Sequence, residues 1–121
     1  MAAIVIAAAY FLVLRGSSKV SLEIWVTKGE DPQARYSTMT SAETENARVW
    51  VKGPGGTTVS FQVWVTFPSG EKATYGPGFQ TDPAGNPVNC GGFASALFQG
   101  TWTFEVMIDN TAVGSTTLTV T

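Results

Sequence analysis

Residues 2–14 form an uncharged apolar segment that contains neither Gly nor Pro, and the chain after them is much more polar. A helix that is apolar on all sides is buried by its surroundings rather than exposed to water. Ala and Leu favour a helix here, and Arg15 with Gly16 supplies a C-terminal stop. We therefore predict a hydrophobic helix over residues 1–15, a neck over residues 16–19 and a β-domain over residues 20–121.

The apolar segment needs a partner that buries it. As a helix the segment would be about 20 Å long, which is shorter than the hydrocarbon core of a membrane, about 30 Å. It also fits a secretory signal poorly, because such signals have Lys or Arg before the apolar run and none is present here. Burying its larger side chains would contribute on the order of 10–20 kcal/mol, against an association cost of about 4–15 kcal/mol. We expect copies of the segment to pack together. The residues expected to form this core are Ile4, Val5, Ile6, Tyr10, Phe11, Leu12, Val13 and Leu14.

The rest of the chain has the alternating pattern of β-strands. It is clearest over residues 58–67, where Val59, Phe61, Val63, Val65 and Phe67 alternate with polar residues or Trp64. Strands are predicted over residues 20–27, 47–52, 58–67, 71–75, 93–98, 101–108 and 112–120, with a further short one within 35–40. Residues 76–92 are rich in Gly and Pro and are predicted to form a long loop. Seven short strands without an internal helix predict a β-sandwich.

Composition excludes several classes of function. Charged residues make up 13% of the chain, about half the usual share, and the net charge of −2 offers no basic stripe for nucleic acid. The chain has no His and a single Cys, Cys90, which removes His-dependent catalytic triads, His-based metal sites and an intrachain disulfide. Cys90 is predicted to be a small buried side chain in a turn.

No residues carry a recognisable catalytic, cofactor-binding or metal-binding pattern, so we predict that the chain is not an enzyme. The acidic residues Glu30 and Asp31, or Glu43 and Glu45, lack the spacing of a calcium-binding loop. The Gly-rich residues 53–56 and 76–78 lack the Lys-Ser/Thr ending of a phosphate-binding loop and are predicted to be turns.

Three of the four tryptophans stand at unusual positions. Trp102 falls on an apolar strand face, whereas Trp25 and Trp64 fall among polar residues and Trp50 is also predicted to point outward. Such side chains could be covered by residues 28–45, form an interface with a neighbouring subunit, or stack on sugar rings. We therefore take Trp25, Trp50 and Trp64 as a candidate surface interface.

Residues 100–106 and 114–120 form a closing hairpin that resembles the last two strands of immunoglobulin-like domains found on microbial cell surfaces. Residues 1–14, the neck and the β-domain together resemble archaeal type IV pilins and related adhesion-filament subunits. The resemblance implies an immunoglobulin-like β-sandwich head preceded by a short hydrophobic N-terminal α-helix. It also implies an extracellular homo-polymer whose N-terminal helices form the filament core, whose heads form the sheath, and whose subunits wait in the membrane before assembly.

Two alternatives remain open at the level of sequence. The chain could be a membrane-anchored immunoglobulin-like module of the cell surface that binds glycan or protein. Residues 2–14 could instead act as a donor strand inserted into the next subunit, although Ala7, Ala8 and Ala9 interrupt the alternation that such a strand requires.

Overall fold

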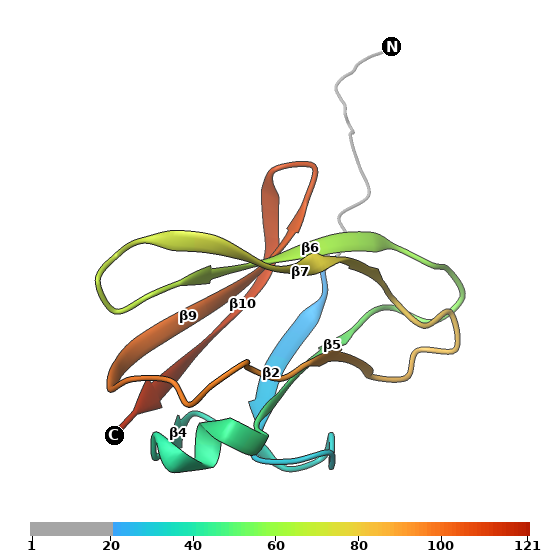
Figure 1. Ribbon diagram of the computed structural model, residues 1–121. Coiled ribbons are helices and arrows are strands. Elements are labelled where there is room, and N and C mark those ends of the chain that lie inside the picture. Colours follow the sequence, from blue (N-terminus) through green and yellow to red (C-terminus); the bar gives the residue numbers. More distant parts are fainter. Residues whose placement is uncertain (1–20) are drawn as a thin grey trace.

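The computed structural model describes residues 21–121, which form two β-sheets and a short 3-10 helix (Figure 1). The elements are β2 (Glu23–Thr27), β3 (Arg35–Tyr36), β4 (Thr38–Met39), η1 (Ala42–Asn46), β5 (Arg48–Lys52), β6 (Ser60–Thr66), β7 (Lys72–Gln80), β8 (Val88–Gly91), β9 (Gly100–Ile108) and β10 (Thr111–Val120). The prediction of a mainly β domain is confirmed. The predicted helix over residues 1–15, the neck over residues 16–19 and residue 20 lie outside the described residues.

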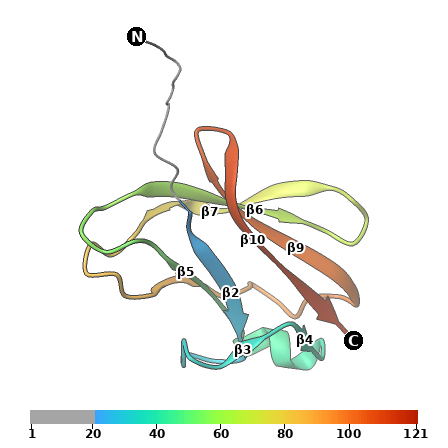
Figure 2. The ribbon, with the colours of Figure 1, turned by 180° about the vertical axis from the view of Figure 1, so that it is seen from behind.

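The two sheets contain five and four strands. The five-stranded sheet has the order β4-β10-β9-β6-β7, and the four-stranded sheet has the order β3-β2-β5-β8. All neighbouring strands are antiparallel except β4 and β10, which are parallel. The chain changes sheet five times, between β3 and β4, β4 and β5, β5 and β6, β7 and β8, and β8 and β9. Figure 2 shows the two sheets from behind.

Both sheets contribute to one hydrophobic core, as the alternating pattern predicts. The inward residues of β6 and β9 face those of β2 and β5, and strand positions between them point outward. The inward side chains are Ile24, Val26, Val49, Val51, Phe61, Val63, Val65, Trp102, Phe104 and Val106. The core position predicted for Trp102 is therefore confirmed.

Strand β7 extends into the segment that was predicted to be a loop. Phe61 pairs with Phe79 and Val63 pairs with Tyr75, so a single residue of β6 lies opposite three residues of β7. Gly76 and Gly78 have φ angles of +77° and +110°, which allow this bulge without steric strain. Strand β8 also forms within residues 76–92, so the prediction of one long loop is wrong there.

The predicted strand over residues 93–98 is wrong, because contacts with other parts of the chain hold this segment outside either sheet. The Phe93 ring packs against Tyr75 and Phe104, with ring centroids 5.8 and 5.9 Å away. The buried Leu97 donates its backbone N–H to Thr44 Oγ1 at 2.8 Å.

The 3-10 helix η1 corrects the expectation that the β-domain has no internal helix. Thr40 and Glu43 begin it with reciprocal bonds: Glu43 N–H donates to Thr40 Oγ1 at 3.2 Å, and Thr40 N–H donates to Glu43 Oε1 at 2.8 Å. This is the capping-box arrangement, in which a Thr and a Glu three residues apart satisfy each other's backbone donors.

The strands at the sheet edges are short or interrupted. Strands β3 and β4 have 2 residues each, β8 has 4, and β7 carries the glycine bulge. Short and bulged edges oppose pairing with the strands of another molecule. Within residues 21–121, no helix combines the length and hydropathy that crossing a membrane requires.

Candidate functional site

Trp25 and Trp50 lie opposite each other on β2 and β5, on the outward face of the four-stranded sheet. They are nevertheless only 4% and 7% exposed. The Trp25 indole N–H donates to the Pro32 carbonyl at 2.8 Å, and the Arg35 guanidinium lies 4.0 Å from the centre of its ring. The segment after β2 therefore covers Trp25, which was one of the three alternatives.

Trp50 is held by a buried hydrogen bond. Its indole N–H donates to Thr27 Oγ1 at 2.8 Å, and Thr27 is itself fully buried and donates its hydroxyl to the Gly29 carbonyl. The expectation that Trp25 and Trp50 form a surface interface is corrected, because their own chain has removed both from solvent. Trp64 remains half-buried on the other sheet.

The outward face of the five-stranded sheet is open. No helix or strand of residues 21–121 lies over it in either ribbon view (Figures 1 and 2). Strand register places Gln62, Trp64 and Thr66 of β6 beside Met107, Glu105 and Thr103 of β9 on this face. The side chains on it are mostly polar and uncharged.

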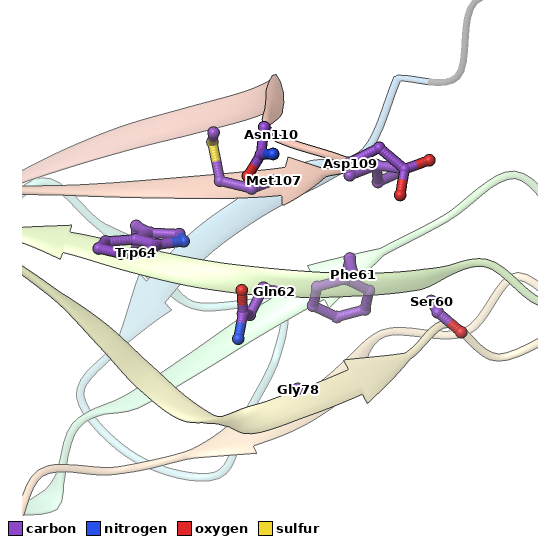
Figure 3. Close-up of a pocket in the computed structure, with 9 residues that line it drawn as sticks. Ser60, Phe61, Gln62, Trp64, Gly78, Met107, Asp109 and Asn110 are labelled. Atoms are coloured by element: carbon purple, nitrogen blue, oxygen red, sulfur yellow. The ribbon is translucent and has the colours of Figure 1, made fainter.

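A hollow of about 390 Å³ lies on this face beside Trp64, near the turn that joins β9 to β10 (Figure 3). Its lining comes from strands β6, β7 and β9 and from the turn. The lining residues are Ser60, Phe61, Gln62, Trp64, Gly78, Met107, Ile108, Asp109 and Asn110. We refer to it as the Trp64 hollow.

Three local features of the sequence build the hollow. Alternation along β6 places Gln62 and Trp64 on the outward face, and the register pairs Gln62 with Met107. Asp109 and Asn110 have φ angles of +49° and +67°, as a two-residue type I′ turn requires, so the predicted hairpin turn is confirmed. The β7 bulge brings Gly78 to the opposite side of the hollow.

The hollow combines one aromatic face with several hydrogen-bonding groups. Gln62 and Asn110 supply amides, Ser60 supplies a hydroxyl and Asp109 supplies a carboxylate. Asp109 is the one ionisable side chain among the lining residues that the structure describes. Outside the hollow, Lys72 Nζ lies 3.9 Å from Glu105 Oε1, and Glu105 is the cross-strand neighbour of Trp64.

A second hollow lies beside Trp25 and has a different chemistry. It is also about 390 Å³ and is lined by Arg35, Lys52, Gln33 and Asn86 among other residues. Two positively charged side chains, Arg35 and Lys52, line this hollow, and Arg35 already covers the ring of Trp25. An aromatic surface is therefore open to a ligand at Trp64 and closed at Trp25.

Cys90 is buried, as predicted, but lies in strand β8 rather than in a turn. Burial raises the pKa of its thiol to about 12, so the reactive thiolate is disfavoured at neutral pH. Tyr75, which donates its hydroxyl to the Gly92 carbonyl at 2.6 Å, also has its pKa raised to about 12, chiefly by burial.

Two of the acidic residues considered for calcium, Glu30 and Glu43, lie in ion pairs. Lys28 Nζ lies 2.8 Å from Glu43 Oε2, and this contact lowers the pKa of Glu43. Arg48 Nη2 lies 3.7 Å from Glu30 Oε2. Across residues 21–121, no three His, Cys, Asp or Glu side chains group closely enough to hold a metal ion.

Sequence reasoning singled out Trp64 but missed the residues around it. Gln62, Met107 and Asn110 look unremarkable one by one, and they come together only through the pairing of β6 with β9 and the Asp109–Asn110 turn. The predicted core residues between Ile4 and Leu14 lie outside the described part of the chain. Comparison with protein-family models, curated proteins and solved structures gives no match.

Proposed function

We propose that this protein is a structural subunit of an extracellular, type IV pilus-like filament rather than an enzyme. The apolar residues 2–14 of many copies pack together in the filament core. Residues 20–121 form an immunoglobulin-like β-sandwich head, and the heads make the outer sheath. The subunit resides in the membrane before assembly, and the filament serves adhesion or motility at the cell surface.

The observation that carries the proposal is the contrast between the apolar segment and the head. Residues 2–14 carry no charge and need an apolar environment. In the described head, the edge strands β3, β4 and β8 have 2, 2 and 4 residues and β7 is bulged, so these four strands give another chain little backbone to pair with. Assembly is therefore best explained by packing of the N-terminal segments.

The sheet arrangement supports the immunoglobulin-like part of the proposal. Two sheets share one core, the chain changes sheet five times, and an antiparallel hairpin of β9 and β10 closes the domain. These features agree with the resemblance of residues 100–106 and 114–120 to the closing strands of such domains.

Electron microscopy of the full chain and of a variant lacking residues 1–15 tests the filament proposal. The full chain should form filaments, and the truncated chain should be a soluble monomer by light scattering. As a matched pair, Leu12→Asp should abolish filaments, whereas Thr117→Asp on the exposed face of the head should not. Polymers that persist without residues 1–15 would contradict the proposal.

A second candidate function is a membrane-anchored cell-surface module that binds glycan or protein. The observation that favours it is the half-buried Trp64 beside an open hollow. The full chain prepared for electron microscopy also distinguishes the two functions. In lipid vesicles an anchored module should stay monomeric, whereas a filament subunit should polymerise.

A further inference from the structure

We propose that the Trp64 hollow binds a neutral saccharide, with one pyranose ring stacked on the Trp64 indole. The inference rests on the recognition role proposed above as the second candidate function, and it holds equally for a head in a filament. It adds the position of the site and the chemical class of its ligand.

The first support is the state of the Trp64 indole. Trp25, Trp50 and Trp102 each donate their indole N–H to an acceptor within the domain, at 2.8, 2.8 and 3.0 Å. Within residues 21–121, Trp64 has no such acceptor, and its ring is half-buried on the open sheet face. In Figure 3 the nitrogen end of this ring points toward the other lining residues. Trp64 therefore offers both an aromatic face and a donor to a ligand.

The second support is the kind of polar group around that ring. The amides of Gln62 and Asn110 can each donate and accept, as sugar hydroxyls do. Ser60 adds a hydroxyl that accepts a long hydrogen bond from Gln80 Nε2 at 3.4 Å, and Asp109 adds an acceptor. The C–H face of a pyranose ring is apolar and packs on an aromatic ring, while its hydroxyls reach such groups at the edge.

The third support is charge. Among residues 21–121, no Lys or Arg lines the hollow, and the one ionisable side chain there is the acidic Asp109. Lys72, on the same sheet face, is paired with Glu105. Phosphate, sulfate or uronate groups would therefore meet no opposing charge and would be repelled by Asp109. The hollow beside Trp25 has the opposite character, because Arg35 and Lys52 line it.

The fourth support is size and rigidity. The volume of about 390 Å³ lies at the lower end of the range of small-molecule sites, about 300–1,000 Å³. The polar groups come from paired strands and from a tight turn, so no backbone segment has to become ordered on binding. A site of this size fits one or two sugar rings rather than a large ligand.

Calorimetry of the full chain, in mild detergent, tests the inference with neutral gluco-, manno- and galacto-oligosaccharides as probes. Uronic-acid and sulfated oligosaccharides of similar length serve as charged counterparts. At least one neutral probe should bind more tightly than every charged one. Trp64→Ala should weaken that binding at least about tenfold, and Trp64→Phe, which keeps the ring but loses the N–H, should fall in between.

The variant Asn110→Gly distinguishes the loss of a contact with the ligand from a loss of folding. Glycine accepts the positive φ of this turn position, so the variant removes the amide while keeping the hairpin. We expect about threefold to tenfold weaker binding with an unchanged melting temperature. Thr117→Ala, on the same sheet face but outside the hollow, should bind like the parent.

Several results would overturn the inference: no neutral probe binds, a charged probe binds as tightly, or Trp64→Ala binds like the parent. If Trp64→Ala does not fold, Asn110→Gly decides, and parental affinity in that variant overturns the inference. If the chain forms filaments but binds no saccharide, only this inference is overturned. If it binds saccharide but forms no filaments, only the filament proposal is overturned.

Discussion

Replacing Gly114 by Ala gives the sharpest test of the fold, because Gly114 lies where the two sheets touch. A Cβ atom at this position would lie 2.1 Å from the Leu22 carbonyl oxygen. Leu22 N–H also donates to the Val113 carbonyl at 3.1 Å, and the β10 register shifts between Ala112 and Gly114. This contact fixes where residues 21 and 22 join the head.

The size of the effect follows from the geometry. Ordinary van der Waals contacts of a Cβ atom are 3.4–4 Å, so one of two backbone segments must move by more than about 1 Å. Overpacking of this kind typically costs about 1–3 kcal/mol, and a clash with backbone rather than a flexible side chain belongs at the upper end. For a domain of this size, about 2–3 kcal/mol lowers the melting temperature by about 10–20 °C.

Gly29→Ala is the matched control, because it adds the same methyl group where no atom lies within 4 Å. It should change the free energy of unfolding by no more than about 0.5 kcal/mol. Both variants are compared with the parent by thermal unfolding followed by circular dichroism. If Gly114→Ala melts within about 2 °C of Gly29→Ala, the close approach of Leu22 to β10 is wrong.

Three further predictions concern the buried polar groups. Thr27→Val leaves the Trp50 indole N–H without its acceptor and should lower the free energy of unfolding, measured in urea, by about 1–3 kcal/mol. A double-mutant cycle with Trp50→Phe should show coupling between the two positions, whereas additive effects would argue against this hydrogen bond. Cys90 should resist iodoacetamide at pH 8 until the chain unfolds, because burial raises its pKa to about 12; rapid labelling of the native chain would contradict this. The raised pKa values of Cys90 and Tyr75 mean that the folded state keeps protons that the unfolded state releases, so stability present below about pH 9 should fall between about pH 9 and 12. Cys90→Ala should flatten that decline in urea titrations, and an equally steep decline would refute the assignment to Cys90.

The strands that sequence predicts best are those with uninterrupted alternation. Residues 58–67 and 101–108 correspond to β6 and β9, with their apolar positions in the core. The alternating pattern does not predict the full length of β7. Gly76 and Gly78 are typical of loops, but here they allow a bulge within the strand. The pattern fails again at residues 93–98, where an apolar run is held by tertiary contacts instead of by a sheet.

One missed element did have a local signal. Thr40 and Glu43 have the spacing of a capping box, and that pattern predicts the start of a helix at η1. Such a signal depends on four consecutive residues and needs no knowledge of the tertiary fold. The predicted β-domain was therefore right in class but lacked this helix.

The candidate site illustrates a different limit. Period-two alternation correctly placed Trp25, Trp50 and Trp64 on outward faces, because it depends only on local backbone geometry. Whether an outward side chain meets solvent depends on what the chain does afterwards. Residues 32–35 return over Trp25, whereas in the described chain nothing returns over Trp64.

The two outer faces therefore differ in how freely their sequences can change. Trp25, Thr27 and Trp50 make the outside of the four-stranded sheet a second buried layer, so substitutions there disturb packing. Outside the five-stranded sheet, positions such as Thr101, Thr117 and Thr119 are exposed and make no contribution to the core. A library randomised at these exposed positions should keep the fold, which makes this sheet a ready scaffold for displaying new binding surfaces.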